Sequence, residues 1–131
     1  GVSDKPSQNG WQRMPRGRVS EAGPGCTLMS AGLLFNARTL NELGKPEYVV
    51  IDYRVNPRAI WVSKASASDQ GVRKLVKGRS GSAVVGLTNR YKELIIGPHW
   101  VEASRRRRGL FLLGKMANGA FEVEIPLDAD R

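Results

Sequence analysis

The feature that most constrains the fold is the stretch from Ser30 to Lys64, in which signals for a strand, a helix and a hairpin follow one another closely. The apolar run Leu33-Leu34-Phe35 is typical of a strand, and Asn36 behind it is a residue that accepts a backbone N–H bond at a helix N-cap. A helix that starts there must end at Gly44-Pro46, because glycine takes positive φ freely and proline cannot continue a helix. A helix of about two turns is unstable alone. We therefore expect it to be held by packing against strands.

The chain after this helix predicts a hairpin. Tyr48 to Tyr53 is rich in β-branched and aromatic residues, Asn56-Pro57 interrupts it, and Arg58 to Ser63 resumes the same pattern. The tip of the hairpin would carry Arg54 and Arg58. The stretch as a whole therefore predicts a β-α-β-β unit.

This unit resembles the AbrB/MazE-type swapped-hairpin (SpoVT-AbrB-type) DNA-binding domain. Gly32 and the strand behind it stand where that family has its glycine and first strand, and Leu40, Leu43 and Gly44 stand where it has its helix face and stop. The resemblance implies half of a β-barrel, which members of the family complete by dimerising, and duplex DNA as the partner.

The second half of the chain repeats this outline. A shift of 52 positions places Val85 on Leu33 and Ile95 on Leu43, and a helix is predicted from Asn89 to Ile96. The match is explained either by a degenerate duplication or by chance between units of similar pattern. If it is a duplication, two half-barrels in one chain would close a barrel without a partner.

The predicted fold class is therefore mainly β with short helices, built from β-α-β-β units into a swapped-hairpin-like β-barrel. We expect a flexible basic arm at residues 1–24 and a single β-rich domain at 25–131, made of possible repeats at 26–66 and 79–126. Within it, Cys26 to Phe35 is predicted as one strand, bent at Gly32. Met116 to Gly119 is predicted as a hairpin turn before a strand with one buried face.

The composition excludes several classes of site. With one cysteine and one histidine, the chain can form neither an internal disulfide nor a His/Cys zinc cluster of its own. Cys26 is expected to be a small buried residue, and the larger aromatic side chains are expected to be mostly in the core. No apolar run is long enough to span a membrane and no secretory signal is visible, so a cytoplasmic protein without cofactors is expected.

The charge is the clearest functional signal. The net charge is +9, and the segment from Arg73 to Arg108 holds ten Lys and Arg against Glu93 and Glu102. In the last ten residues the balance is reversed, with Glu122, Glu124, Asp128 and Asp130 against Arg131. Such an asymmetry is typical of a face that binds a polyanion, most commonly nucleic acid.

Candidate nucleic-acid-binding residues are the basic side chains at predicted turns, tips and helix starts. The alternative for the run 105–108 is a solvated turn or a targeting signal. The candidates are Arg105, Arg106, Arg107, Arg108, Arg54, Arg58, Arg73, Lys74, Lys77, Arg79, Arg38 and Arg90.

No arrangement of nucleophile, base or paired carboxylates typical of an enzyme is visible, so we predict that the chain is not an enzyme. The sequence favours a DNA-binding protein that regulates transcription through arginine-rich loops on duplex DNA, with a homodimer as a possible assembly. The alternative is an antitoxin-like or phage-type interaction module that binds RNA or an acidic protein.

Overall fold

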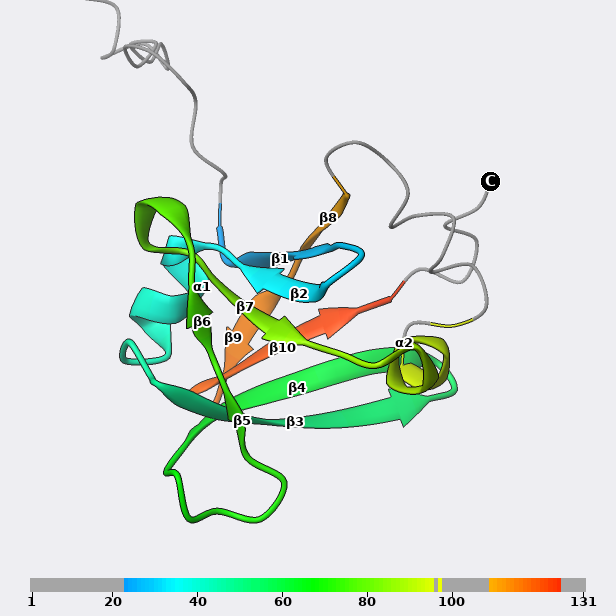
Figure 1. The fold of residues 1–131 in the computed structure, drawn as a ribbon. Coiled ribbons are helices and arrows are strands. Elements are labelled where there is room, and N and C mark those ends of the chain that lie inside the picture. Colours follow the sequence, from blue (N-terminus) through cyan, green and yellow to red (C-terminus); the bar gives the residue numbers. More distant parts are fainter. Residues whose placement is uncertain (1–22, 96, 98–108, 126–131) are drawn as a thin grey trace, which may run out of the picture.

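Two packed antiparallel sheets and two short α-helices make up the part of the chain that the computed structural model describes, residues 23–95, 97 and 109–125 (Figure 1). Sheet A has the order β6 (Val76–Lys77), β7 (Ala83–Gly86), β2 (Gly32–Phe35), β1 (Gly25–Leu28) and β8 (Leu110–Leu113). Sheet B has the order β5 (Arg73–Lys74), β3 (Tyr48–Val55), β4 (Arg58–Ala65), β10 (Ala120–Glu124) and β9 (Lys115–Ala117). The helices are α1 (Ala37–Glu42) and α2 (Asn89–Ile95), with a 3-10 turn, η2 (Arg79–Gly81), before β7. The predicted mainly β class is confirmed.

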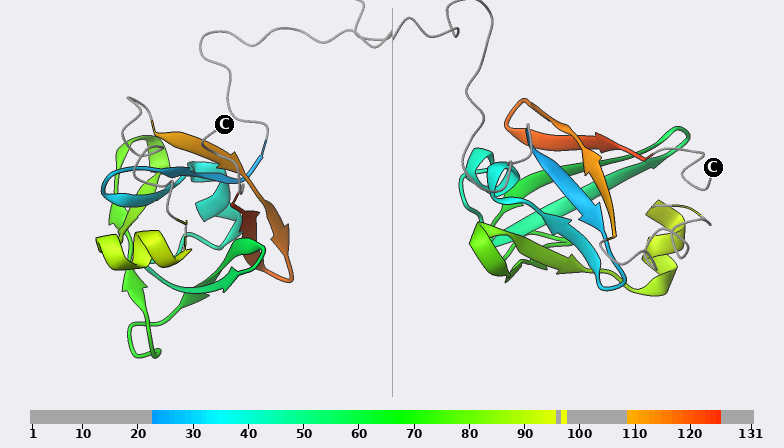
Figure 2. Two further views of the ribbon diagram at one scale, coloured as in Figure 1. Left: turned by 90° about the vertical axis from the view of Figure 1, so that its right-hand side faces the viewer. Right: turned by 90° about the horizontal axis from the view of Figure 1, so that it is seen from above.

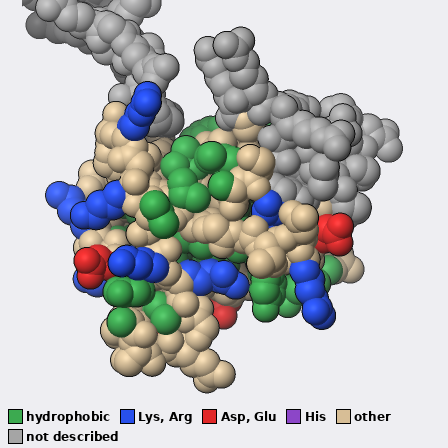
Figure 3. Space-filling model, viewed as in Figure 1, with side chains coloured by type: hydrophobic (Ala, Val, Ile, Leu, Met, Phe, Trp, Pro, Cys, Tyr) green, Lys and Arg blue, Asp and Glu red, His purple; other side chains and the backbone are tan. Residues whose placement is uncertain are grey.

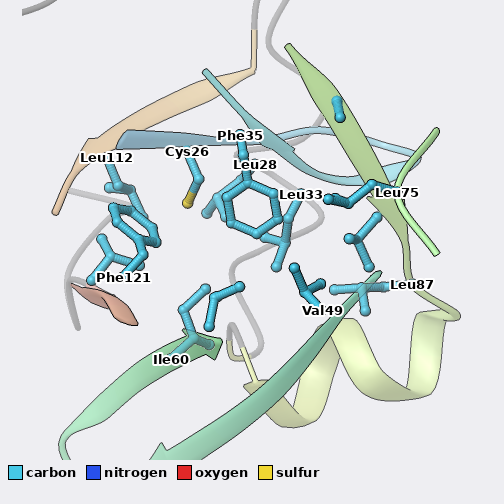
Figure 4. Close-up of a cluster of buried hydrophobic side chains, with 14 of the residues drawn as sticks. Cys26, Leu28, Leu33, Phe35, Val49, Ile60, Leu75, Leu87, Leu112 and Phe121 are labelled. Carbon is cyan, nitrogen blue, oxygen red and sulfur yellow. The ribbon is translucent and has the colours of Figure 1, made fainter. Parts of the chain in front are cut away.

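The core lies between the two sheets, which form two layers with α1 and α2 at opposite ends (Figure 2). Alternate residues of each strand point inward, as the period of a strand requires. Phe35 from sheet A and Phe121 from sheet B meet edge to face, with ring centroids 6.0 Å apart (Figure 4). Each is fully buried. Burial of a side chain of this size contributes ~3 kcal/mol to folding.

Helix α1 starts where the sequence predicts. The Asn36 side chain accepts a hydrogen bond from the Thr39 backbone N–H at 2.9 Å. The buried Thr39 hydroxyl in turn accepts from the Gly25 N–H at 2.7 Å, which ties the helix to the beginning of β1. Gly44, with φ of +87°, ends the helix. The short helix is thus held by a cap and a buried hydrogen bond as well as by apolar packing.

The single strand predicted from Cys26 to Phe35 is wrong. The segment instead folds back into the hairpin β1–β2, in which Cys26 pairs with Phe35. Reciprocal hydrogen bonds between Met29 and Gly32, at 2.9 and 3.1 Å, close its turn. Gly32 has φ of +151°, a conformation that favours glycine, so the predicted bend there is a full reversal of the chain.

The two halves of the chain have related pairing. Leu33 in β2 pairs with Val85 in β7, the residue 52 positions later, and the same offset relates the first residues of α1 and α2. The hairpin β3–β4 turns at Asn56-Pro57. The hairpin β9–β10, in the second half of the chain, turns 62 positions later at Asn118-Gly119. The offset therefore changes between the helix and the hairpin. The sequence also predicts a strand at residues 99–104, which lie outside the described part.

A closed barrel was predicted, and none is found in the described ranges. The chain passes from sheet B to sheet A at Leu75, between β5 and β6, and from sheet A to sheet B at Gly114, between β8 and β9. The pairing of β9 with β10 ends at Lys115 and Glu122. Strand β8, which precedes β9 in the chain, does not continue this pairing and pairs with β1 instead. This divergence, a V in Figure 1, keeps the two hydrogen-bond ladders separate.

No helix of the described residues has the length and apolar character needed to cross a membrane.

Candidate nucleic-acid interface

Basic side chains gather where the chain crosses from sheet B to sheet A. We call this set the basic edge. Figure 3 shows Lys and Arg side chains in a band across the face on which β5 and β6 lie. The basic edge comprises Arg73 and Lys74 of β5, Lys77 of β6, Arg79 of η2, Arg38 of α1 and Arg90 of α2.

The crossing segment is anchored by one apolar residue. Leu75 is 6% exposed, and its backbone N–H donates to the Glu47 carbonyl oxygen at 3.0 Å. The residues on either side belong to strands that end their sheets, so Lys74 and Lys77 are exposed to solvent. The pattern of one buried leucine between exposed cations thus fixes the backbone while leaving the charges available.

Two contacts connect this segment to the helices. The Arg73 guanidinium lies 5.2 Å from the centre of the Tyr91 ring, a cation–π contact that sets α2 beside β5. At the other end, η2 packs on α1, where a Cβ on Gly81 would lie 3.2 Å from the Cβ of Ala37. The cations of three separate segments therefore follow one side of the molecule.

The charges of the basic edge are mostly unneutralised. Arg38 forms an ion pair with Glu42 one turn later in α1. Within the described residues, the other members of the basic edge have no ion pair. A segment from Arg73 to Arg79 in extended form spans about 20 Å. That length exceeds the ~12 Å width of the DNA major groove and reaches several phosphates of one strand.

Arg54 and Arg58 do not join the basic edge. They lie at the hairpin tip, whereas Lys74 pairs with Tyr48 at the opposite end of β3. The Arg54 Nε donates to the Pro57 carbonyl oxygen at 2.8 Å, which uses this group to close the turn. Arg54 and Arg58, which the sequence also marks as candidates, therefore lie apart from Arg73 and Lys74, because the length of β3 separates them.

The outer face of sheet B has the opposite character. On this face, four paired residues lie side by side across the strands. Trp61 of β4 lies between Asp52 of β3 and Glu122 of β10, and Lys115 of β9 lies beyond Glu122. Glu124 follows on the same face. These carboxylates oppose a polyanion, so the two sides of the molecule differ in what they can bind. The sequence shows the alternation of Glu122 and Glu124, but Asp52 joins them only through strand pairing.

Several aromatic residues predicted for the core are exposed. Tyr53 is 44% exposed, Tyr91 41% and Phe111 42%, while Phe35 and Phe121 are the fully buried aromatic residues of the described ranges. Tyr91 thereby becomes part of the candidate site through its contact with Arg73, a role that no local sequence pattern indicates.

Lys92 of α2 is also unexpected, because it is 7% exposed and its ammonium donates to the Ser30 carbonyl oxygen. It is a structural tie between α2 and the β1–β2 turn.

The run from Arg105 to Arg108 and the arm at residues 1–24, apart from its last two positions, lie outside the described residues, so their predicted roles stay predictions.

Cys26 is buried as predicted, with no exposed surface, and burial raises the pKa of its thiol to about 12. The thiolate is the reactive form. We therefore expect the native protein to resist a thiol reagent at pH 8 and to react fully once urea unfolds it. Rapid labelling of the native protein, followed by absorbance, would contradict this burial.

The described residues hold no group of three His, Cys, Asp or Glu side chains that would bind a metal ion. The side chains of the basic edge offer positive charge and hydrogen-bond donors. Comparisons of the chain with protein-family models, with curated proteins and with solved structures find no match.

Proposed function

We propose that this chain is a non-enzymatic DNA-binding protein that places its basic edge on the phosphate backbone of duplex DNA, as a regulator of transcription. The observation that carries the proposal is the gathering of unneutralised cations from β5, β6, η2 and α2 along one side. Phosphate contacts supply the sequence-independent part of DNA affinity, and arginine also reads guanine edges in the major groove.

The acidic outer face of sheet B supports the same orientation. Asp52, Glu122 and Glu124 would repel phosphates that approached from that side. The protein therefore has a preferred side toward a polyanion, which a uniformly basic surface would not give.

We also propose that the fold is a degenerate single-chain form of the swapped-hairpin arrangement. The supporting features are the pairing of Leu33 with Val85 and the pairing of the two hairpins through β4 and β10. In a dimer of single units, equivalent strands would pair across the two-fold axis in this way.

The test is the salt dependence of binding to a labelled duplex, compared with a single-stranded RNA of the same length, measured by fluorescence anisotropy. Five cations on phosphates predict a slope of log affinity against log salt of about −4.5, and a loss of affinity of a few hundredfold between 50 and 200 mM salt. Preference for the RNA would favour the RNA-binding alternative. Absence of salt-dependent binding to either would contradict the proposal.

A further inference from the structure

Strand β8 differs from every other strand that ends a sheet in the described part of the chain. The four such strands are β5, β6, β8 and β9. Three of them carry cations, with Arg73 and Lys74 in β5, Lys77 in β6 and Lys115 in β9. Strand β8 reads Leu-Phe-Leu-Leu and carries none. Lysine on an edge strand blocks pairing with another molecule, so β8 lacks the protection that the other edges have.

The side chains of β8 are exposed on one face. Leu112 points into the core and is 8% exposed, whereas Phe111 is 42% and Leu113 60% exposed. Phe111 and Leu113 thus place two large apolar side chains on an edge strand that has no charge to block pairing.

The backbone of β8 also has free hydrogen-bonding groups. The Gly114 N–H donates to the Pro24 carbonyl oxygen at 3.0 Å, and Leu112 pairs with Cys26. Because successive residues of a strand point their N–H and C=O groups to opposite sides, those of Phe111 and Leu113 point away from β1. Among the described residues, no strand pairs with this side of β8.

There is room beside this edge. A cleft of about 720 Å³ lies between β8–β9, at Leu112 to Lys115, and β10, at Glu122 to Ile125. It forms where β8 diverges from β10. The hairpin β3–β4 in the first half of the chain has no such gap between its strands, because β3 pairs with β4 over its whole length.

A second copy of the chain fits this edge, because an identical β8 strand offers the same free backbone groups and the same uncharged, apolar side chains. Two molecules with a net charge of +9 repel each other. Residues 109–114 contain no charge, so two β8 strands can meet without an unfavourable pair at the contact. The β6 edge of the same sheet carries Lys77, with Arg79 two residues later, so two β6 strands would bring like charges close together.

We propose that two copies of the chain form a symmetric dimer by antiparallel pairing of their β8 strands, which joins the two A sheets edge to edge. The free backbone groups select the register of this pairing. Only one symmetric register lets the N–H and C=O groups of both Phe111 and Leu113 bond within the two β8 strands. Phe111 then pairs with Leu113 of the partner subunit, and the two-fold axis passes through the pairing of Leu112 with its counterpart. Each symmetric Phe–Leu pair lies on the outer face, where such cross-strand contacts stabilise a sheet. This assembly does not depend on DNA binding.

The first test is the mass in solution of Leu113→Lys, measured by light scattering at tens of micromolar protein. We expect the parent to be a dimer and this variant to be a monomer with an unchanged circular dichroism spectrum. Val76→Lys is the matched control, because Val76 is 64% exposed on β6 at the other edge of sheet A. It should remain a dimer. A monomeric parent, or a dimeric Leu113→Lys, would overturn the proposal.

The second test checks the register and does not rely on a disruptive variant. Residues paired in this way have Cα atoms ~5.5 Å apart, within the range of a disulfide. A mixture of Phe111→Cys and Leu113→Cys chains should form a mixed cross-linked dimer on mild oxidation, whereas a mixture of Val76→Cys with either should not. Absence of the Phe111–Leu113 cross-link would contradict the proposed pairing.

Discussion

Replacement of Lys74, Lys77, Arg79 and Arg90 by alanine is expected to lower the affinity for duplex DNA by two orders of magnitude or more at moderate salt. All four side chains are exposed, so the free energy of unfolding should change by about 1 kcal/mol or less. If each contacts a phosphate, the slope of log affinity against log salt should become shallower by up to about 0.9 per contact. Fluorescence anisotropy at several salt concentrations measures both quantities.

The matched control removes cations from the outer face of sheet B. Arg54→Ala with Lys115→Ala removes the same charge as Lys77→Ala with Arg79→Ala, but from the side that bears the carboxylates. The control pair should change affinity by less than about threefold, and the basic-edge pair by tenfold or more. Equal losses from both pairs would mean that net charge alone determines binding.

Replacement of the four arginines 105–108 by alanine removes the same number of charges as the variant of the basic edge, so the two variants can be compared. The replacement is predicted to weaken duplex binding by an order of magnitude or more if these arginines contact phosphates. A folded variant that binds with the parent's affinity and salt slope would limit the interface to the basic edge.

Gly32→Ala is expected to lower the free energy of unfolding by ~3 kcal/mol or more, because alanine is strained at this backbone conformation and also lacks space. A Cβ at Gly32 would lie 2.1 Å from the Val85 backbone oxygen, and φ is +151°. Relief would require β2 to move away from β7, where Gly32 pairs with Gly86. Urea unfolding followed by circular dichroism measures the loss.

Gly86→Ala provides the control for this change. Gly86 faces Gly32 on the same ladder, but a Cβ there would lie 3.8 Å from the Ala31 backbone oxygen, an ordinary contact. Its effect on the free energy of unfolding should be within about 1 kcal/mol. If both variants lost the same stability, the close approach at Gly32 would not be the cause.

Local signals predicted much of the fold. The cap at Asn36, the helix stop at Gly44 and the turn at Asn118-Gly119 each depend on the conformational preference of one or two residues, and the structure confirms all three. The sequence does not predict the turn between β1 and β2, because Met29-Ser30-Ala31 has only the weak turn preference of serine, so the reversal depends on Gly32 and on the pairing of the two strands.

The candidate site required tertiary structure. Arg73 and Lys74 could be recognised as candidates from charge, but their proximity to α1 and α2 follows from the passage of β5 into β6 across the two sheets. Arg54 and Arg58 look equivalent to them in sequence and are separated by the length of β3. Charge pattern therefore identifies the residue types of an interface, whereas strand pairing decides which of them share a side.

In the proposed complex, the side of the molecule formed by β5, β6 and η2 faces duplex DNA. The most direct measurement is a titration of ¹⁵N-labelled protein with a short duplex, followed by the NMR shifts of the backbone amides. We expect the amides of residues 73–79 and of the first turns of α1 and α2 to shift first and most. Shifts centred on β9, β10 and the outer face of sheet B, with the amides of residues 73–79 unchanged at saturation, would contradict it.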